Sequence, residues 1–378
     1  MTKNTYSPFF VADVRRAETQ AFFTFGSAFS GAGGADLGYS LAGGRPAFAI
    51  ERDPEAVRTF RRNFPDVHVE QRDFREVAAN AEVIDKILHR NALGRGDLDL
   101  FHASPPCNEI SHLGSGPQDG GSAELIFDVV GMTKVARPRV LVVENVPNLA
   151  RRHRYLLDAA LELLRSDAIG RRIYYANWRI LRADDYGVPQ ERHRLFLLAV
   201  RADVCNVTGI TSDQDMLRLF PSATHAPISV EAALAGLRQR ETALHPFRRV
   251  TMTSNLGHLA RRLPVDPQRW TRARDVGLGG YRFTTMRMAR NRPSPTLTAC
   301  GQQPDGRSGI IHHAEPRKLS VPEMMRLSSW PDDFVFTGTV AQAAIRLGMS
   351  VPPLMAKAIG ESVYERVLRP YHEATTKT

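Results

Sequence analysis

The sequence predicts an α/β protein with a mostly parallel sheet flanked by helices, followed by a second, smaller domain of irregular structure. Short apolar runs alternate with helical patterns from Phe22 to Ala199, which is typical of consecutive strand and helix units. The alternation fades between about Val204 and Arg290, and helical spacing returns after Pro293. We therefore expect a first domain at 1–203, a second at 204–290, and a C-terminal segment that returns to the first domain at 291–378.

Apolar runs mark the expected strands of the sheet. They lie at residues 22–29, 46–51, 98–103, 140–144 and 195–200, with a shorter extended segment at 67–72. Helices are expected from near residue 35, at 321–330 and at 341–367. Several polar residues stand at the carboxyl ends of these strands, which is where open α/β sheets bind their ligands.

The composition favours a cytoplasmic protein that binds a polyanion. The chain has 378 residues, a net charge of +10 and a pI near 9.8, and basic proteins attract polyanionic partners. Its three cysteines are far apart and form no C-x-x-C pair, so we expect neither a disulfide framework nor a bound metal. Since no signal peptide and no membrane-length apolar stretch is evident, we expect a soluble protein without a membrane partner.

A glycine-rich motif, F-S-G-A-G-G from Phe29 to Gly34, lies between an expected strand and an expected helix. Its glycines allow backbone amides to approach a ligand closely, although a tight structural turn is an alternative because the motif departs from G-x-G-x-x-G. Glu51 ends the next strand, where an acidic residue meets ribose hydroxyls in nucleotide-binding units. Asp73 follows a third extended segment and is either an acceptor for an adenine amino group or a helix N-cap.

Two prolines precede Cys107 in the motif S-P-P-C, directly after an expected strand. Prolines stiffen the backbone, and rigid presentation of one thiol suits a nucleophile. A buried structural cysteine in a proline turn is the competing interpretation. The position of Cys107 at the ligand edge of the sheet favours the nucleophile.

Glu144 ends a fully apolar strand, which is costly for a carboxylate unless it is paired or protonated. Either condition suits a residue that donates a proton or hydrogen bond to a ring nitrogen, and helix capping is the alternative. Arg192 and Arg194 alternate at the start of another strand, so we expect them on one face. Two guanidinium groups beside a thiol and a carboxylate would form an anion-holding site.

The order of these motifs resembles that of the DNA (cytosine-5)-methyltransferase family. The resemblance runs from Phe25 to about Glu365, outside the middle domain, and is specific because it requires many short motifs in one order. The motifs are F-S-G-A-G-G at 29–34, Glu51, Asp73, S-P-P-C at 104–107, E-N-V at 144–146, Q-E-R-H-R at 190–194, R-P-S-P-T-L-T at 292–298, R-L-S-S-W-P-D-D-F at 326–334 and G-M-S-V-P-P at 348–353.

The resemblance implies a Rossmann-like methyltransferase fold and S-adenosylmethionine as the cofactor. Late in the chain, Ser350 and Val351 would close the cofactor pocket. The residues expected to bind the cofactor are Phe29, Ser30, Gly31, Ala32, Gly33, Gly34, Glu51, Arg52, Asp73, Phe74, Ser104, Pro105, Ser350 and Val351.

The resemblance also implies a mechanism. Cys107 would attack carbon 6 of a cytosine flipped out of double-stranded DNA, while Glu144 binds ring nitrogen 3 and the exocyclic amine. Methyl transfer to carbon 5, loss of the carbon 5 proton and expulsion of the thiol would follow. Arg192 would orient the base and Glu144, with Arg194 in support. The middle domain would be the target recognition domain.

Two segments depart from the family pattern. Asn108 and Ile110 stand where the family has glutamine and phenylalanine, and Met349 replaces an asparagine of the late motif. Neither change removes a reacting group, so we expect activity, with an altered rate or substrate tolerance.

The resemblance implies further properties of the protein in its cell. We expect a monomer that acts on DNA in the bacterial cytoplasm. It would either have a cognate restriction endonuclease as functional partner or act as a solitary methylase. Three alternatives remain open: the RNA-directed branch of the same family, a nicotinamide-dependent oxidoreductase, and a catalytically silent DNA-binding relative.

Overall fold

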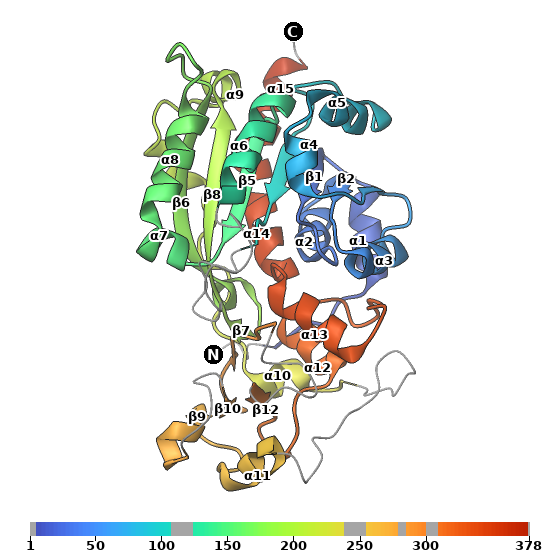
Figure 1. Ribbon diagram of the computed structural model, residues 1–378, viewed down its shortest axis with the longest axis vertical. Helices are drawn as coiled ribbons and strands as arrows, with labels where there is room; N and C mark the ends of the chain where they lie inside the picture. The colour runs from blue at the N-terminus through green and yellow to red at the C-terminus, as the bar shows by residue number, and fades with distance from the viewer. Residues whose placement is uncertain (1–4, 107–123, 238–254, 279–284, 300–308, 377–378) are drawn as a thin grey trace.

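The computed structural model describes residues 5–106, 124–237, 255–278, 285–299 and 309–376. Its centre is a seven-stranded sheet in the order β3-β2-β1-β4-β5-β8-β6 (Figure 1). Six strands of this sheet run in one direction and β8 runs in the opposite one, so the expected mostly parallel α/β architecture is confirmed. The strands are β1 (Phe23–Ala28), β2 (Gly44–Ile50), β3 (His68–Glu70), β4 (Leu100–Ala103), β5 (Val140–Asn145), β6 (Tyr174–Arg182) and β8 (His193–Arg201).

Helices cover both faces of the sheet. Along β5, Leu141 and Val143 pack toward one helical layer, whereas Val140 and Val142 pack toward the other. Burial on both faces explains why this strand is a continuous apolar run. The first layer holds α4 (Phe74–Ala78), α5 (Ala81–Arg90), α6 (Leu125–Ala136) and α8 (Arg154–Arg165), and the second holds α2 (Gly34–Leu41), α9 (Ala202–Thr208) and α14 (Pro353–Val363).

The remaining helices of the sheet domain lie at its margins (Figure 1). They are α1 (Val11–Glu18), α3 (Pro54–Asn63), α7 (Asn148–Arg152) and α15 (Arg369–Thr375). Within the described ranges, none of the helices combines the length and the apolarity that crossing a bilayer requires.

Three features differ from the sequence-based expectation. Strand β6 was not expected, because it is an edge strand that carries Asn177 and Arg179 and lacks an apolar run. The expected helix over 341–367 is two helices, α13 (Val340–Met349) and α14, because two prolines interrupt it at Pro352 and Pro353. The helix expected at 321–330 ends earlier, as α12 (Val321–Leu327), and Ser329 then adopts a positive φ of 57°.

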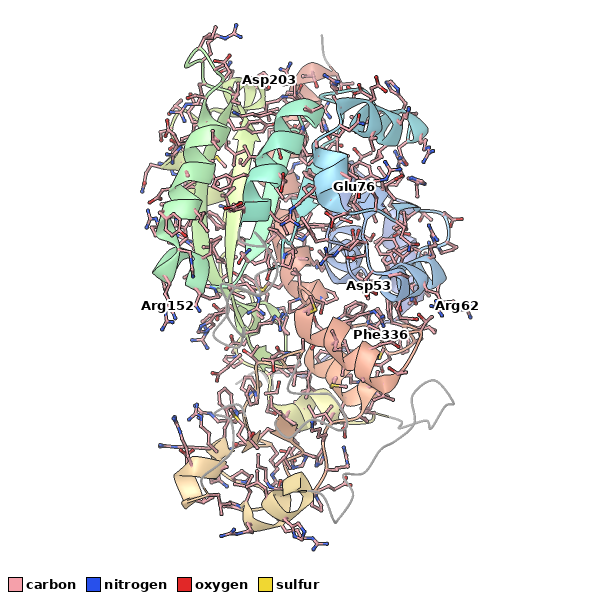
Figure 2. The ribbon with its side chains drawn as sticks, in the orientation of Figure 1. Asp53, Arg62, Glu76, Arg152, Asp203 and Phe336 are labelled. Atoms are coloured by element: carbon pink, nitrogen blue, oxygen red, sulfur yellow. The ribbon has the colours of Figure 1, made fainter. Side chains whose placement is uncertain are left out.

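A smaller unit lies below the sheet domain (Figure 1). It contains α11 (Asn255–Arg262) and a three-stranded sheet of β9 (Thr271–Arg272), β10 (Met286–Arg287) and β12 (Ile310–Ile311). The buried Arg287 guanidinium ties this unit together, donating to the carbonyls of Ala260, His312, His313 and Glu315. Figure 2 shows nitrogen-tipped side chains around its surface.

The connection between the two units is continuous packing. Val204 and Phe220 belong to the core beside the sheet, whereas α10 (Val230–Leu234) packs with α12. Strand β11 (Ser294–Pro295) pairs with β7 (Gln190–Glu191) above the small sheet. The division into domains at 203 and 290 stays a prediction.

The C-terminal segment returns to the first domain by close contact of α14 with α2. A Cβ placed on Gly38 of α2 would lie 2.3 Å from the carbonyl oxygen of Pro353, and one on Gly360 would lie 2.9 Å from Cβ of Ala42. Similarly, a Cβ on Gly34 would lie 2.5 Å from the Val351 carbonyl oxygen. Glycines on both helices therefore allow the two backbones to touch.

We predict that Gly38→Ala lowers the free energy of unfolding by about 1–3 kcal/mol, because the added methyl group meets backbone rather than a flexible side chain. Gly131→Ala, in the exposed middle of α6 with no atom within 4 Å of the new Cβ, is the matched control. It should raise stability by up to about 1 kcal/mol through helix propensity. Denaturant unfolding measures both; equal effects would contradict the proposed helix contact.

Candidate active site and cofactor pocket

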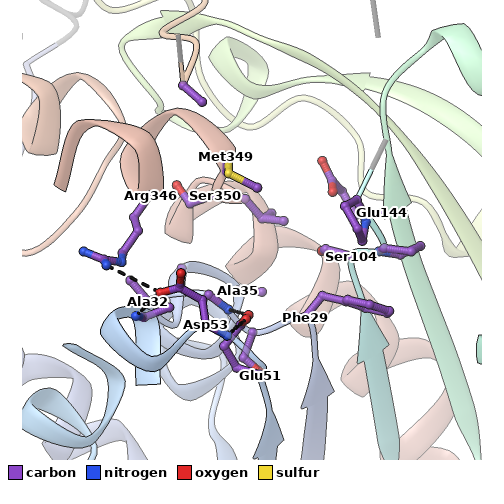
Figure 3. Close-up of a pocket in the computed structure, with 18 of the residues that line it drawn as sticks. Phe29, Ala32, Ala35, Glu51, Asp53, Ser104, Glu144, Arg346, Met349 and Ser350 are labelled. Atoms are coloured by element: carbon purple, nitrogen blue, oxygen red, sulfur yellow. Dashed lines mark hydrogen bonds and ion pairs between the residues drawn. The ribbon is translucent and has the colours of Figure 1, made fainter. Parts of the chain in front are cut away.

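A cavity of about 860 Å³ opens at the carboxyl ends of β1, β2, β4 and β5. Helix α13 and the residues after it form the facing wall (Figure 3). Glu51 and Asp53 stand at one end of the cavity, and Glu144 with Ser104 stands at the other. The volume suits a small-molecule ligand, and acidic groups at both ends can orient it.

The glycine-rich turn forms the floor of the cavity between β1 and α2. Phe29 and Gly31 have positive φ angles of 55° and 56°. A Cβ on Gly31 would meet no atom within 4 Å, so glycine is favoured there by backbone conformation and not by space. Gly33 also has a positive φ, of 94°, and in addition its Cβ would lie 2.7 Å from the ring of Phe64. Gly33 therefore makes room for a neighbouring helix and is not among the cavity-lining residues.

Backbone amides hold Glu51 in place. Its Oε2 accepts a hydrogen bond from the Gly31 amide at 2.8 Å, and its Oε1 accepts from the amides of Arg52 and Asp53 at 2.8 and 2.9 Å. Asp53 in turn lies 3.6 Å from the guanidinium of Arg346 on α13 (Figure 3). This ion pair joins the strand side of the cavity to the facing helix.

Two aromatic rings and a capped carboxylate flank this end of the cavity. The ring centroids of Phe29 and Phe74 lie 4.7 Å apart. Asp73 is the N-cap of α4, where it accepts from the Arg75 amide, and it also pairs with Arg52 at 3.0 Å. Burial raises the pKa of Asp73, but the Arg75 amide and Arg52 outweigh it and lower the pKa overall. The N-cap alternative is confirmed, and Asp73 also lines the cavity.

At the other end, Glu144 is a buried carboxyl with a cationic partner. Its Oε1 lies 2.9 Å from Nε of Arg194. Burial raises the pKa of Glu144, and the opposing effects of Arg194, Arg192 and a hydrogen bond from Ser104 do not fully offset it. The carboxyl therefore holds a proton to a higher pH than an exposed glutamate does.

Arg192 is placed differently from the expectation. It is buried and does not line the cavity; its guanidinium donates to the carbonyls of Leu297, Gly348 and Ser350 at 2.8–3.0 Å. Arg194, expected only in support, forms the ion pair with Glu144. The sequence could not show this, because the carbonyls that hold Arg192 lie more than one hundred residues away.

The turn that leads to Cys107 is anchored at the cavity edge. The Ser104 amide donates to the Ala28 carbonyl at 3.3 Å, and the side chain of Asn145 donates to the Pro105 carbonyl at 3.3 Å. Ser104, Pro105 and Pro106 all line the cavity. Cys107 itself lies outside the described residues, as do Asn108 and Ile110.

Most predicted residues meet around this one cavity. All the residues predicted to bind the cofactor line the cavity, with the exception of Gly33. Sequence reasoning missed Asp53, Asn145 and Arg346, of which the first two directly follow predicted site positions at strand ends. Met349, a departure from the family motif, also lines the cavity and is 56% exposed.

Known proteins resemble this chain over nearly its whole length. The type II methyltransferase M.Eco47II of Escherichia coli is 29% identical over 347 residues, covering 89% of this chain and 77% of that protein. M.XorII of Xanthomonas oryzae pv. oryzae is 27% identical over 368 residues, covering 89% and 83%. The crystal structure of S. pombe Dnmt2 methyltransferase shares the fold, with a TM-score of 0.61 at 15% identity and coverage of 92% and 99%.

A family model described as C-5 cytosine-specific DNA methylase matches residues 23–365. The match includes the sheet, the cavity and the C-terminal segment that closes the cavity. The chain therefore belongs to the family of C-5 cytosine-specific DNA methylases.

Proposed function

We propose that the protein transfers a methyl group from S-adenosylmethionine to carbon 5 of a cytosine in double-stranded DNA. The observation that carries the proposal is that one cavity joins the glycine-rich turn and Glu51 to Glu144, with Pro106 of the cysteine-bearing turn on its wall. A methyl donor and a cytosine placed at its two ends would therefore be neighbours.

The residues at the first end fit the cofactor. A ring can lie against Phe29 and Ile50, and the Glu51 carboxylate, already oriented by backbone amides, can accept from ribose hydroxyls. Ser350 and Val351 would close this part of the pocket, and Asp73 would accept from the adenine amino group. When bound, S-adenosylmethionine supplies a methyl group activated by a sulfonium.

The residues at the second end fit a pyrimidine. The Cys107 thiolate would form a bond to carbon 6 while the protonated Glu144 donates to ring nitrogen 3, so the electrons of the carbon 5–carbon 6 double bond become available at carbon 5. After carbon 5 is methylated, a base removes its proton and the bond from carbon 6 to sulfur breaks, which restores the double bond and the thiolate. Arg194 would hold Glu144 in the orientation required.

DNA is the substrate class that we propose for this site. The cytosine must leave the duplex to reach a cavity at the sheet edge, at a cost of a few kcal/mol. The lower unit carries exposed arginines, among them Arg262, Arg269 and Arg274, and would act as the target recognition domain. A cognate restriction endonuclease and a monomeric state on DNA remain part of this proposal.

We predict that DNA with 5-fluorocytosine at the target forms a covalent adduct with the wild-type protein in the presence of the cofactor, because fluorine cannot leave as a proton does. Cys107→Ala should form none. Cys205→Ala should still form the adduct, since Cys205 is buried in α9 and its pKa is raised to about 12 by burial. Denaturing gel electrophoresis detects the adduct. An adduct with Cys107→Ala, or with transfer RNA in place of the duplex, would refute the assignment.

We predict that Glu51→Gln weakens S-adenosylhomocysteine binding by about tenfold or more, because hydrogen bonds to a charged acceptor are lost. Glu76→Gln is the control, since Glu76 is exposed on α4 (Figure 2) and does not line the cavity. Isothermal titration calorimetry measures both. Equal affinities in the two variants would place the ligand elsewhere.

We predict that the single-turnover rate of methyl transfer falls as pH rises through the pKa of Glu144, because the protonated carboxyl is the donor and burial raises that pKa. Glu144→Gln should be slower by about 10²–10³-fold and should lack this part of the pH profile. Rapid-quench measurements with labelled cofactor test it. An unchanged profile in the variant would assign the titration to another group.

A further inference from the structure

A chain of buried polar side chains runs from α2 to Glu144 and is not used by the mechanism above. The Tyr39 hydroxyl on α2 lies 3.0 Å from Nδ1 of His102 on β4. Nε2 of His102 lies 2.8 Å from Oγ of Ser104. Ser104 stands beside Glu144 on the cavity wall (Figure 3), where a hydrogen bond from its side chain lowers the pKa of the carboxyl. Tyr39 and His102 are at most 1% exposed. The chain therefore connects the neighbourhood of the Glu144 carboxyl with the interior of the sheet domain.

The position of His102 follows from the strand register. It lies opposite Ser27 of β1 and Val142 of β5, on the face of the sheet that packs against α2 and α14. Val142 and Leu100 on this face are apolar, so a leucine or valine would be the ordinary residue at 102. A polar ring buried there is costly unless it is hydrogen-bonded on both nitrogens.

The donor and acceptor of each hydrogen bond can be assigned by starting from the Glu144 carboxylate. An ionised carboxylate carries no hydrogen, so in its bond with Ser104 the hydroxyl is the donor and Glu144 the acceptor. The Ser104 oxygen then accepts from Nε2–H of His102, which leaves Nδ1 to accept from the Tyr39 hydroxyl. Burial lowers the pKa of His102 to about 3, so the ring is neutral at physiological pH and has this one tautomer.

We propose that His102, with Tyr39 behind it, is a positioning residue that keeps the Ser104 hydroxyl turned toward Glu144 as a hydrogen-bond donor. A serine hydroxyl can otherwise rotate to another acceptor, which would leave one carboxyl oxygen of a buried glutamate without this bond. The positioning role rests on the proposed function of Glu144, whereas the hydrogen-bond chain exists independently of it.

Other charged and titratable groups face this chain. Arg194 contacts Glu144 directly, and Arg192 acts on it through its charge. On α2, Asp36 acts on Tyr39; it accepts from Ser27, and burial raises its pKa to about 7. None of these groups replaces the donor to Ser104. A substitution at His102 should therefore act on Glu144 through Ser104.

The first test is the tautomer, which needs no substrate. Nitrogen-15 NMR of the full chain with labelled histidine should show for His102 a neutral ring, protonated on Nε2, that does not titrate between about pH 5 and pH 8. His312, whose Nδ1 accepts from the amides of Ala314 and Glu315 and whose pKa burial lowers to about 4, should give a second signal of this kind. The chain has twelve histidines, so the His102 signal is identified by its absence in His102→Gln. A ring protonated on Nδ1, or one that titrates in this range, would overturn the hydrogen-bond chain.

The second test is kinetic. His102→Leu should slow single-turnover methyl transfer about tenfold and move the Glu144-dependent part of the pH profile upward, since the Ser104 hydroxyl that lowers the pKa of Glu144 is no longer held toward the carboxyl. His102→Gln, whose amide nitrogen can replace Nε2–H, should restore both toward wild type. In a Ser104→Ala background, His102→Leu should have no further effect on the profile.

The outcomes separate the two proposals. An unchanged pH profile in His102→Leu would overturn the positioning role, as would a shift by His102→Leu that is as large in the Ser104→Ala background as in the wild type. In either case 5-fluorocytosine trapping would still support the function. Failure of trapping in the wild type would refute the proposed function and the positioning role with it. The NMR result would still show whether the hydrogen bonds from Tyr39 through His102 to Ser104 exist. Should His102→Leu not fold, Tyr39→Phe provides the milder change, with a smaller upward shift expected.

Discussion

The backbones of α2 and α14 touch, and this contact brings together segments that are more than three hundred residues apart. Gly34 and Gly38 have no side chains to separate them from the carbonyls of Val351 and Pro353. Ser350 and Val351 can line the cavity because the next residues are packed against the glycine-rich turn. Arg192 strengthens the same junction by donating to the carbonyls around Ser350. The facing wall of the site is therefore part of the folded core.

The charged groups of the cavity are largely oriented by the protein itself. Backbone amides hold Glu51, Arg346 pairs with Asp53, and Arg194 pairs with Glu144. Fixed carboxylates need less reorganisation when a ligand arrives, and groups of this kind contribute most to binding and catalysis in a partly dehydrated site. The buried chain from Tyr39 continues this principle into the interior, because it orients a hydroxyl that acts on Glu144.

The sequence-based expectations were most accurate where function depends on short local motifs. The turn around Gly31, the carboxylates Glu51 and Glu144, and the S-P-P turn all stand at strand ends, and parallel strands bring these ends to one edge. Expectations were weaker where partners are distant. The edge strand β6 carries too many polar residues to be recognised, and the roles of Arg192 and Arg194 depend on which carbonyls or carboxylates surround them.

The sequence by itself determined the α/β class, the family and the residue types of the site, because periodicity and motif order are properties of the chain. Only the tertiary structure decided which guanidinium meets Glu144, that Arg346 faces Asp53, and that His102 connects Tyr39 with Ser104. These contacts join strands and helices far apart along the chain. Their geometry depends on how the sheet twists and how its helices pack, which no local pattern specifies.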